Sequence, residues 1–431
     1  MNRVPILGIP IDKLTKEQFL KKLDDLMAER HPQQIATVNA EFLVETQKDA
    51  GFRAVLQQSS LNTADGIGVL WAAKYLSLPL WNVWVVRIWI LIFQLIWSGL
   101  LIIFYPKHIR SVIPQKISGS EAIWWIAEHA EKKSCSIFLL GGFNNTAEIV
   151  SKKLKEKYPL LNVAGAYAGT PVQQGIVERI NKVKPDILLV AYGQVVQEKW
   201  IAKNLQNLAV SMAIGVGGTF DYIAGIKPYA PQFLRSIGLE WLHRLFTQPF
   251  RWKRVVNAVI TFPWYIMRHR LQILKPYRKN VAACILNEKN EILLCRRKIE
   301  TREDFYTLGK EHWQLPQGGV DAGEEETEAL VREVREETGL KHIEVIGELL
   351  NTHSYQWPIT MARGWAKIYR GQVQSLYFIK FHSDHDKITL DNDEFDEYKW
   401  VSKNELINEI HPVRKKIAET IVKNFDRFVK N

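Results

Sequence analysis

Three glutamates in the last third of the chain have the spacing of a metal-binding helix. Glu333, Glu336 and Glu337 are three and four residues apart, so on a helix their carboxylates converge on one face. Carboxylates packed this closely repel one another unless a cation lies among them. Oxygen ligands with open water positions suit Mg²⁺ or Mn²⁺, which can bridge a diphosphate. The spacing therefore predicts a site for Mg²⁺ or Mn²⁺ that can bind a diphosphate.

The segment around these acids follows a known pattern. Residues 318–340 read GGVDAGEEETEALVREVREETGL. Gly318 and Gly319 let the backbone approach a substrate, Arg332 can pair with the acids, and Gly339 suits the left-handed residue that ends a helix. A solvated acidic helix with a glycine cap is the alternative, but it does not account for the complete set of positions. The segment resembles the Nudix box. This resemblance implies metal-assisted cleavage of a phosphoanhydride, with Glu336 and Glu337 in catalytic roles.

Flanking motifs narrow this resemblance to the RNA pyrophosphohydrolase and dinucleoside polyphosphate hydrolase group. The motifs are residues 277–281, 313–319, 369–374 and 394–401. The resemblance covers residues 277–428 and implies an α/β/α sandwich that hydrolyses a nucleoside polyphosphate or an RNA 5′ end. The metal site that it implies consists of Glu333, Glu336, Glu337 and Glu394. It gives Glu394 the role of completing the site or activating water, and makes Arg278 and Arg297 phosphate contacts. Surface or structural roles for these three residues stay open.

The length and net charge of the chain limit the number of its domains and the kind of partner that it binds. With 431 residues the chain is long enough for two or three domains, and its formal net charge of +11 favours anionic partners. Nucleotides, nucleic acid and an anionic membrane surface all meet that condition. Cys135, Cys284 and Cys295 are isolated and lack metal-ligand spacing, which fits a reducing compartment. The first ten residues contain no long apolar stretch, so no secretory signal peptide is expected.

The chain before residue 226 alternates between strand and helix patterns. Short apolar runs suited to buried parallel strands occupy residues 34–39, 135–140, 186–192 and 210–216. Amphipathic stretches, such as those at residues 15–29 and 146–158, alternate with them. The order predicts an α/β domain with a doubly wound, Rossmann-like sheet and ligands at the carboxyl ends of its strands. No Gly-x-Gly-x-x-Gly fingerprint occurs, which counts against a nicotinamide enzyme.

Short motifs in residues 3–260 are similar to those of the WecG/TagA/CpsF family of glycosyltransferases. They are LGIPID (7–12), TVNAE (37–41), TADGIGV (63–69), FLLGG (138–142), QEKWI (197–201), AIGVGGTFD (213–221) and GLEWL (238–242). The family moves a sugar such as N-acetylmannosamine from a UDP-sugar donor to a polyprenyl-diphosphate-linked sugar acceptor, with inversion and without a metal-binding Asp-x-Asp motif. The resemblance implies an enzyme of cell-surface polysaccharide synthesis, with no cofactor in this domain.

The same resemblance assigns residues of the transferase site. Asp65 matches the base that removes the proton of the acceptor hydroxyl, although an Asp before a Gly can also form a turn or a helix cap. The positions that match the substrate pocket are Thr37, Asn39, Gln197, Glu198, Gly215, Gly217 and Gly218. The last three belong to the loop expected at the donor diphosphate. The sequence departs from the family motifs at two places that bear on which sugar donor is bound. Residues 193–196 read GQVV in place of Gly-Ala-Pro-Lys, and Lys116 replaces an arginine.

An uncharged apolar segment, residues 88–105, interrupts the α/β pattern. It is about as long as a minimal transmembrane helix, and basic residues flank it. Because α/β patterns continue on both sides, we expect a re-entrant or interfacial element that is broken near Ser98–Gly99. The aromatic residues expected near lipid headgroups are Trp81, Trp84, Trp89, Trp97 and Tyr105. A membrane span, a buried helix and the interface of a homo-oligomer are alternatives.

Residues 226–276 interleave basic and aromatic side chains. The basic residues are Arg244, Arg251, Lys253, Arg254, Arg268, His269 and Arg270, and the aromatic ones are Trp241, Phe246, Phe250, Trp252, Phe262, Trp264 and Tyr265. This composition suits an anionic membrane surface and resembles the family's C-terminal appendage, which docks on the membrane. Nucleic acid is the rival partner, and a plain inter-domain helix with a solvated basic face is a third interpretation.

These observations predict three domains. Residues 1–225 form the glycosyltransferase domain with an apolar insert at about 80–113, residues 226–276 form the docking appendage and linker, and residues 277–431 form the Nudix domain. We expect a bifunctional enzyme at the cytoplasmic face of a bacterial membrane. One alternative is a Nudix hydrolase whose N-terminal half only binds sugar nucleotide and tethers the chain. Another is a non-catalytic, nucleotide-sensing scaffold.

Overall fold

The structure, a computed structural model, divides into two compact units, residues 1–47 with 55–270 and residues 48–54 with 271–431. The described residues are 3–29, 31–80, 84–231, 234, 243, 246–247, 252–298, 311–360, 367–382, 387–411 and 414–429.

The first unit is built on a parallel sheet. Among the described residues its strands lie in the order β4-β3-β8-β7-β5-β6, and the neighbouring strands run parallel. The strands are β3 (Gln33–Val38), β4 (Leu61–Ala64), β5 (Ser136–Gly141), β6 (Asn162–Tyr167), β7 (Ile187–Ala191) and β8 (Met212–Gly215). The four apolar runs of the sequence correspond to β3, β5, β7 and β8. The edge strand β6 was not among them, because it is only partly buried and carries alanine and glycine.

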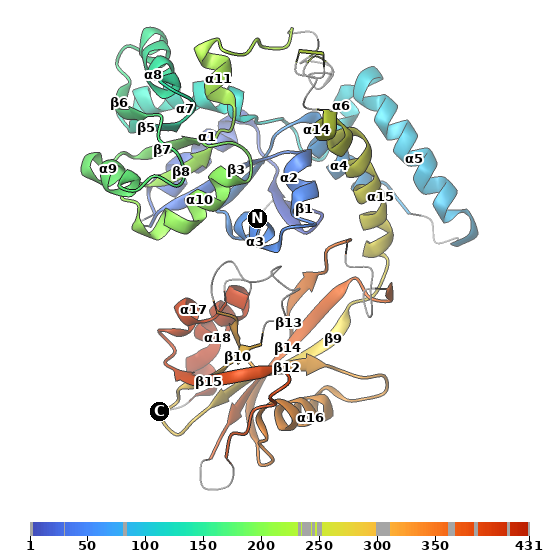
Figure 1. Ribbon diagram of the computed structural model, residues 1–431. Coiled ribbons are helices and arrows are strands. Elements are labelled where there is room, and N and C mark those ends of the chain that lie inside the picture. Colours follow the sequence, from blue (N-terminus) through green and yellow to red (C-terminus); the bar gives the residue numbers. More distant parts are fainter. Residues whose placement is uncertain are drawn as a thin grey trace. The chain divides into compact units, whose positions relative to one another are not determined.

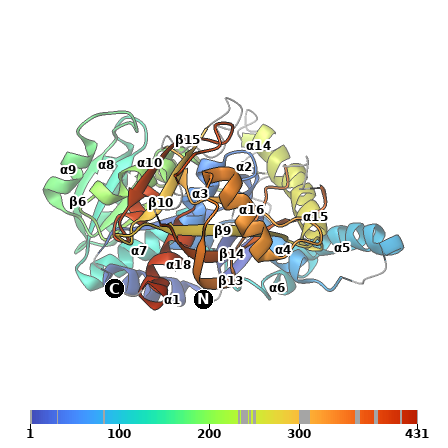
Figure 2. The same cartoon turned by 90° about the horizontal axis from the view of Figure 1, so that it is seen from below.

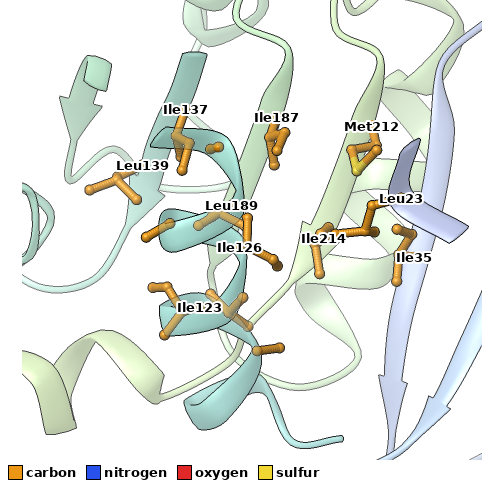
Figure 3. Packing of buried hydrophobic residues seen from close by; sticks show 14 of the residues in the cluster. Leu23, Ile35, Ile123, Ile126, Ile137, Leu139, Ile187, Leu189, Met212 and Ile214 are labelled. Carbon is orange, nitrogen blue, oxygen red and sulfur yellow. The ribbon is translucent and has the colours of Figure 1, made fainter. Parts of the chain in front are cut away.

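Helices cover both faces of this sheet (Figure 1). The helices on one face are α1 (Lys16–Met27), α7 (Gly119–Lys133), α8 (Thr146–Lys157) and α11 (Thr219–Ala224), and those on the other are α9 (Ile176–Val183) and α10 (Val196–Asn204). Ile137 and Leu139 of β5 lie in the cluster that contains Ile126 of α7 (Figure 3). Phe138 and Leu140 belong to the opposite layer. A strand buried on both faces needs apolar residues at successive positions. The predicted doubly wound fold is confirmed.

The remaining elements of the first unit surround the β3–β4 side of the sheet. They are the hairpin β1 (Arg3–Ile6) and β2 (Ile9–Asp12), and the helices α2 (Ala40–Glu45), α3 (Ala50–Gln58), α4 (Ile67–Ser77), α5 (Trp84–Phe104), α6 (Pro106–Ile109), α14 (Trp252–Val256), the π-helix η3 (Asn257–Thr261) and α15 (Phe262–Ile273). The short η1 (Leu205–Asn207) instead follows α10 and contacts α9. In the described part of the chain, Val86–Phe104 is the one helix long and apolar enough to cross a membrane.

Helix α5 continues through Ser98 and Gly99, so the predicted break at these residues is wrong. A single glycine costs a helix only about 1 kcal/mol relative to alanine. The hydroxyl of Ser98 donates to the carbonyl of Leu95 at 3.2 Å and accepts from the indole N–H of Trp71 at 2.9 Å. The Ser98 hydroxyl is therefore satisfied both as a donor and as an acceptor while the backbone stays helical.

The second unit is a mixed sheet between helices. Its strand order is β11-β10-β9-β14-β13, with β12 paired to β9 and β15 paired to β10. The strands are β9 (Arg278–Leu286), β10 (Ile292–Arg297), β11 (Trp313–Gln314), β12 (Gln317–Gly319), β13 (Glu344–Gln356), β14 (Gly371–Lys380) and β15 (Phe395–Val401). Helix α16 (Glu326–Thr338) covers one face, and α17 (Leu406–Glu409) with α18 (Lys415–Phe428) covers the other. The predicted Nudix-like α/β/α arrangement is confirmed.

Candidate active sites

The carboxyl ends of β3 and β8 and the start of α10 meet in a buried hydrogen-bonded cluster. The hydroxyl of Thr37 donates to the carbonyl of Gly215 at 3.1 Å. Nε2 of Gln197 donates to Oε1 of Glu198 at 2.6 Å, and Oε1 of Gln197 accepts from the backbone N–H of Gly217 at 2.9 Å. The side chains of Thr37, Gln197 and Glu198 are all buried. The structure thus brings five of the seven predicted pocket residues into direct contact.

The glycines of this loop differ in what surrounds them. A Cβ at Gly215 would lie 2.3 Å from Oε1 of Glu198, so this position requires glycine because of close approach. Gly217 has φ of +57°, and its N–H donates to Oε1 of Gln197. A Cβ at Gly218 would meet no atom within 4 Å. The same holds at Gly217, so Gly217 and Gly218 both have open space where a Cβ would lie, whereas Gly215 does not.

A γ-turn with positive φ lies next to this cluster. Val195 has φ of 69° and ψ of −50°, and the N–H of Val196 donates to the carbonyl of Gln194 at 2.8 Å. Positive φ is unfavourable for a β-branched residue. Oε2 of Glu198 accepts the N–H of Val195 at 3.0 Å. Burial raises the pKa of Glu198 to about 7, although hydrogen bonds from Gln197 and the backbone oppose the rise. A buried carboxylate therefore holds a strained turn beside the pocket.

Asp65 and Asn39 lie at the same edge of the sheet, because parallel strands end together. Asp65 follows β4, is half-buried, and its N–H donates to the carbonyl of Val38 at 2.8 Å. Gly66, with φ of +113°, then begins α4. The side-chain oxygen of Asn39 accepts from the N–H of Phe42 at 3.0 Å and so caps α2. Asn39 thus has a structural role at the pocket edge.

Arg254 reaches this edge from α14, which sequence reasoning did not foresee. Nη2 of Arg254 donates to Oε1 of Gln194 at 2.5 Å, and its Nε lies 3.2 Å from Oε2 of Glu41. A guanidinium therefore stands beside the 193–196 segment, which lacks the lysine of the family motif. The alternation of basic and aromatic residues in 226–276 was the one sequence feature that drew attention to Arg254.

Two other basic residues of this segment are buried and do not form part of an exposed basic face. They are His269 and Arg270, and Arg270 is only 1% exposed. The Arg270 guanidinium donates to Oε1 of Gln94 at 2.6 Å and to the carbonyl of Leu78 at 2.6 Å. The predicted residues that lie outside the described part of the chain are Trp81, Trp241, Arg244, Phe250, Arg251 and the 238–242 motif.

In the second unit, Arg332 organises the acids around α16. It donates to both carboxylate oxygens of Glu324 at 2.9 Å, to Glu333 at 2.7 Å and to Glu336 at 3.3 Å. A further hydrogen bond of 3.0 Å goes to the carbonyl of Gly319. The contact with Arg332 lowers the pKa of Glu324 to about 2. Glu324 is a residue of this site to which the sequence had given no role.

The four predicted metal ligands form one electrostatically linked group. Burial raises the pKa of Glu337 well above its usual value and raises that of Glu333, and the charge of Glu394 adds to both shifts. Glu337 also accepts the N–H of Gln317 at 2.8 Å. Glu336 is more exposed and contacts Arg332. Within the described ranges, no three His, Cys, Asp or Glu side chains are already arranged as metal ligands.

These carboxylates nevertheless fit a divalent cation. A Cβ at Gly318 would lie 1.7 Å from Cδ of Glu333, so the backbone of β12 lies directly against this carboxylate. The charges of Glu333 and Glu394 disfavour ionisation of Glu337, and those of Glu336 and Glu394 disfavour ionisation of Glu333. A bound cation would remove that repulsion. Oxygen donors of this kind are those that Mg²⁺ accepts.

The two arginines predicted to contact phosphate lie on neighbouring parts of this sheet. Arg278 begins β9, pairs with Asp321 at 3.4 Å, and would be 2.1 Å from a Cβ at Gly319. Arg297 ends β10 opposite Phe395 of β15. Its strand neighbour is therefore the residue that follows Glu394.

Comparisons with known proteins agree with both halves of this description. The sequence profile of the glycosyl transferase WecG/TagA/CpsF family matches residues 4–89 and 94–276, and that of the NUDIX domain matches residues 276–421. An N-acetylglucosaminyldiphosphoundecaprenol N-acetyl-beta-D-mannosaminyltransferase of Bacillus spizizenii is 25% identical over 244 residues, covering 56% of this chain and 82% of that protein. A Staphylococcus aureus protein of the same name is 25% identical over 278 residues, covering 63% and 95%.

Solved structures resemble the C-terminal part. A MutT protein from Methanosarcina mazei Go1 is 26% identical and covers 37% of this chain and 99% of its own, with a TM-score of 0.27. A C. elegans Ap4A hydrolase is 19% identical and covers 35% and 96%, with a TM-score of 0.26. The chain belongs to the WecG/TagA/CpsF family of glycosyltransferases and carries a Nudix hydrolase-like domain at its C-terminal end.

Proposed function

We propose that the first unit transfers an N-acetylmannosamine-like sugar from a UDP-sugar to a polyprenyl-diphosphate-linked N-acetylglucosamine, for a cell-surface polysaccharide. The names of the bacterial relatives support this transferred sugar and this acceptor. The observation that carries the proposal is the gathering of Thr37, Gln197, Glu198 and the Gly215–Gly218 loop at the strand ends, with Asp65 at the same edge.

In this reaction the acceptor hydroxyl oxygen attacks the anomeric carbon while the bond from that carbon to the UDP oxygen breaks. Asp65 takes the hydroxyl proton as the new bond forms, and UDP leaves as an anion. Arg254 supplies positive charge beside the pocket, where the leaving diphosphate develops its charge. Thr37 and Gln197 fix the Gly215 and Gly217 backbone that faces the donor.

We also propose that this transfer takes place at the cytoplasmic face of the membrane. A polyprenyl tail keeps the acceptor in the bilayer, whereas a UDP-sugar reaches the enzyme from water. The first unit exposes large apolar side chains on α5 and on α14–α15 that can contact an anionic membrane surface. An enzyme that joins these two substrates must work at the boundary between them.

For the second unit we propose Mg²⁺-dependent (or Mn²⁺-dependent) hydrolysis of a phosphoanhydride in a nucleoside polyphosphate or an RNA 5′ end. Glu333, Glu337 and Glu394 would hold the metal, with Glu336 at the exposed side of the group. The ion, once bound, neutralises phosphate charge and lowers the pKa of a water nucleophile. Arg332 holds Glu333 and Glu324 in place, and the N–H of Gln317 orients Glu337.

Two assays on the intact protein test these activities separately. The first measures UDP release from UDP-N-acetylmannosamine with a lipid-diphosphate N-acetylglucosamine acceptor. The second measures Mg²⁺-dependent phosphate release from capped nucleotides. Asp65→Asn should abolish only the first activity and Glu337→Gln only the second. Absence of both activities in the wild type would refute the bifunctional assignment.

A second candidate function follows from residues 193–196, where the sequence differs from the family motif. Because Val195 is strained where the family motif has proline, the first unit could bind sugar nucleotide without turning it over, as a membrane tether for the Nudix domain. In that case Asp65→Asn would leave every measurable activity unchanged, while UDP-sugar binding by calorimetry would persist.

A further inference from the structure

Helix α5 presents one apolar stripe to its surroundings. The stripe consists of Trp89, Phe93, Ile96, Trp97, Leu100 and Phe104. Each of these positions is three or four residues from another of them, so they lie on one side of the helix. Trp89, Phe93 and Phe104 are 72%, 66% and 77% exposed. A large apolar surface of this kind on a folded unit marks an interaction site.

The opposite side of α5 is attached to α4. Leu91 and Ser98 are buried there. The indole N–H of Trp71 donates to the hydroxyl of Ser98 at 2.9 Å, and the hydroxyl of Tyr75 donates to the carbonyl of Leu91 at 3.1 Å. The contacts lie seven residues apart along α5, so they fix the direction of the helix as well as its position.

Arg270 of α15 ties the same side of α5 to the rest of the unit. It is buried, donates to Oε1 of Gln94, and stacks over the ring of Tyr75 at 4.6 Å. Nε2 of Gln94 in turn donates to the carbonyl of Pro79 at 3.2 Å. Figures 1 and 2 both show α5 extending from the α4–α15 pair. A charged group is thus fixed beside the middle of the helix.

This arrangement disagrees with a membrane span. If α5 crossed the bilayer, Arg270, Gln94 and the attached α4 would lie at the depth of the hydrocarbon. A charged side chain there costs about 3 kcal/mol or more, and α4 could not follow without unpacking. An orientation in the membrane plane keeps the polar side on the protein and turns the stripe toward lipid.

The charges around α5 select anionic lipid as the occupant. No Asp or Glu occurs between Asp65 and Glu121, a stretch that contains Lys74, Arg87, Lys107, Arg110 and Lys116. A second copy of this chain would oppose like charges, whereas an anionic headgroup layer attracts them.

A second stripe has the same character. Trp252, Val256, Ile260 and Trp264 are exposed at helical spacing along α14, η3 and α15. The sequence between Glu240 and Glu288, which contains these elements, also has no acidic residue. Both exposed apolar stripes therefore lie in acid-free segments.

We propose that α5 is an in-plane membrane helix. It lies parallel to the surface of an anionic bilayer, with its stripe at the boundary between headgroups and acyl chains and both of its ends on the same side. Arg270 and Gln94 hold it in this orientation. The proposal rests on the membrane-side function proposed above, but it predicts a topology that can be measured without turnover.

Cysteine accessibility in membranes tests this topology. In full-length protein carrying Cys135→Ser, the remaining Cys284 and Cys295 are buried. Ile88→Cys, which lies off the stripe, and Tyr105→Cys then place single reactive thiols near the two ends of α5. Leu160→Cys, at a position 87% exposed and away from α5, marks the cytoplasmic side. A membrane-impermeant maleimide should label all three in inside-out vesicles and none in spheroplasts. Labelling of one α5 end in each preparation would show a span and overturn the proposal.

Vesicle binding tests the occupant. Phe93→Asp should weaken binding of the full chain to phosphatidylcholine vesicles containing phosphatidylglycerol by roughly tenfold or more, while the matched Leu160→Asp leaves it unchanged. Equal binding of both variants would overturn the proposal. So would sedimentation equilibrium showing a dimer that Phe93→Asp dissociates. UDP release with a short-chain, water-soluble acceptor, measured in parallel, separates a failed topology from a failed transferase.

Discussion

Gln197 donates its amide Nε2 to Oε1 of Glu198 at 2.6 Å, inside a cluster in which both side chains are buried. Through this bond the carboxylate that supports the strained turn at Val195 also orients the amide that accepts from Gly217. Contact between Glu198 and substrate stays a prediction, and its hydrogen bonds described above are made within the protein. From this geometry we propose that Glu198 positions the loop expected at the donor diphosphate.

The pair predicts a reciprocal rescue. Glu198→Gln leaves either the Val195 N–H or the Gln197 amide facing another donor, which costs about 1–3 kcal/mol of hydrogen bonding in the buried cluster. We expect kcat for transfer to fall roughly tenfold or more, because the rate falls exponentially with the free energy lost in the transition state. Adding Gln197→Glu reverses donor and acceptor and again satisfies Gly217 and Val195, so the double variant should recover most of the rate.

The measurement is kcat and KM for both substrates in the single and double variants, with thermal unfolding as a check on folding. If the double variant is no faster than Glu198→Gln, the hydrogen-bond polarity of this pair does not position the site.

The same carboxyl predicts a pH dependence of stability. Burial raises the pKa of Glu198 from 4.5 to about 7, so the folded protein holds this proton more tightly than the unfolded chain. Its contribution to stability is then fully present below pH 4.5 and is lost as the pH rises to about 7, an effect of about 3 kcal/mol.

Urea unfolding of the wild type and of Glu198→Gln, each at pH 4.5 and pH 7.5, measures this contribution. The difference in unfolding free energy between the two proteins should shift in favour of the variant as pH rises. A difference that stays constant would show that Glu198 keeps an ordinary pKa.

Gly318 predicts a steric block in the second unit. Gly318→Ala places a methyl group on the Glu333 carboxylate, which must turn away from the site. We expect Mg²⁺-dependent hydrolysis to fall by roughly 100-fold, since the loss of one metal ligand or its support typically costs 10–100-fold. Mg²⁺ should also raise the unfolding temperature of the wild type, and this shift should shrink in the variant.

Phosphate release and thermal unfolding, each with Mg²⁺ and with EDTA, provide the readouts. Glu419→Gln, an exposed substitution on α18, serves as the control. Full activity of Gly318→Ala would place the metal away from Glu333.

Arg254 predicts a loss of charge at the transferase pocket. Arg254→Met removes the guanidinium that contacts Glu41 and Gln194, so the KM for the UDP-sugar should rise by roughly tenfold, as expected for loss of one charge-assisted contact. Lys253→Met removes the neighbouring charge, which lies over Trp252, and should leave that KM unchanged. Equal effects of both substitutions on transfer to a water-soluble acceptor would indicate a general charge effect.

Much of the fold was predictable because burial leaves a mark on sequence. Strands β5, β7 and β8 read as apolar runs because helices cover both of their faces, and α16 was evident from its acids and terminal glycine. The edge strand β6 lacks this signal. A break at Ser98–Gly99 was wrongly predicted because the hydrogen bond from Trp71 comes from another helix.

The sites were predictable in part for a similar reason. Motif residues at strand ends share one sheet edge because parallel strands end together, so Thr37, Gln197 and Gly215 could be grouped in advance. Arg254 and Arg270 belong to one basic segment, yet one reaches the pocket edge and the other is buried against Tyr75. Such differences depend on tertiary contacts, which the local sequence does not contain.

The most direct test of the central claim is mass spectrometry of the lipid product formed by the intact protein. UDP-N-acetylmannosamine and a polyprenyl-diphosphate N-acetylglucosamine are supplied, with Asp65→Asn as the matched variant. The account predicts one added N-acetylhexosamine on the lipid and stoichiometric UDP with the wild type, and neither with Asp65→Asn. Unmodified lipid with the wild type across a panel of UDP-sugars, or equal product with Asp65→Asn, would contradict it.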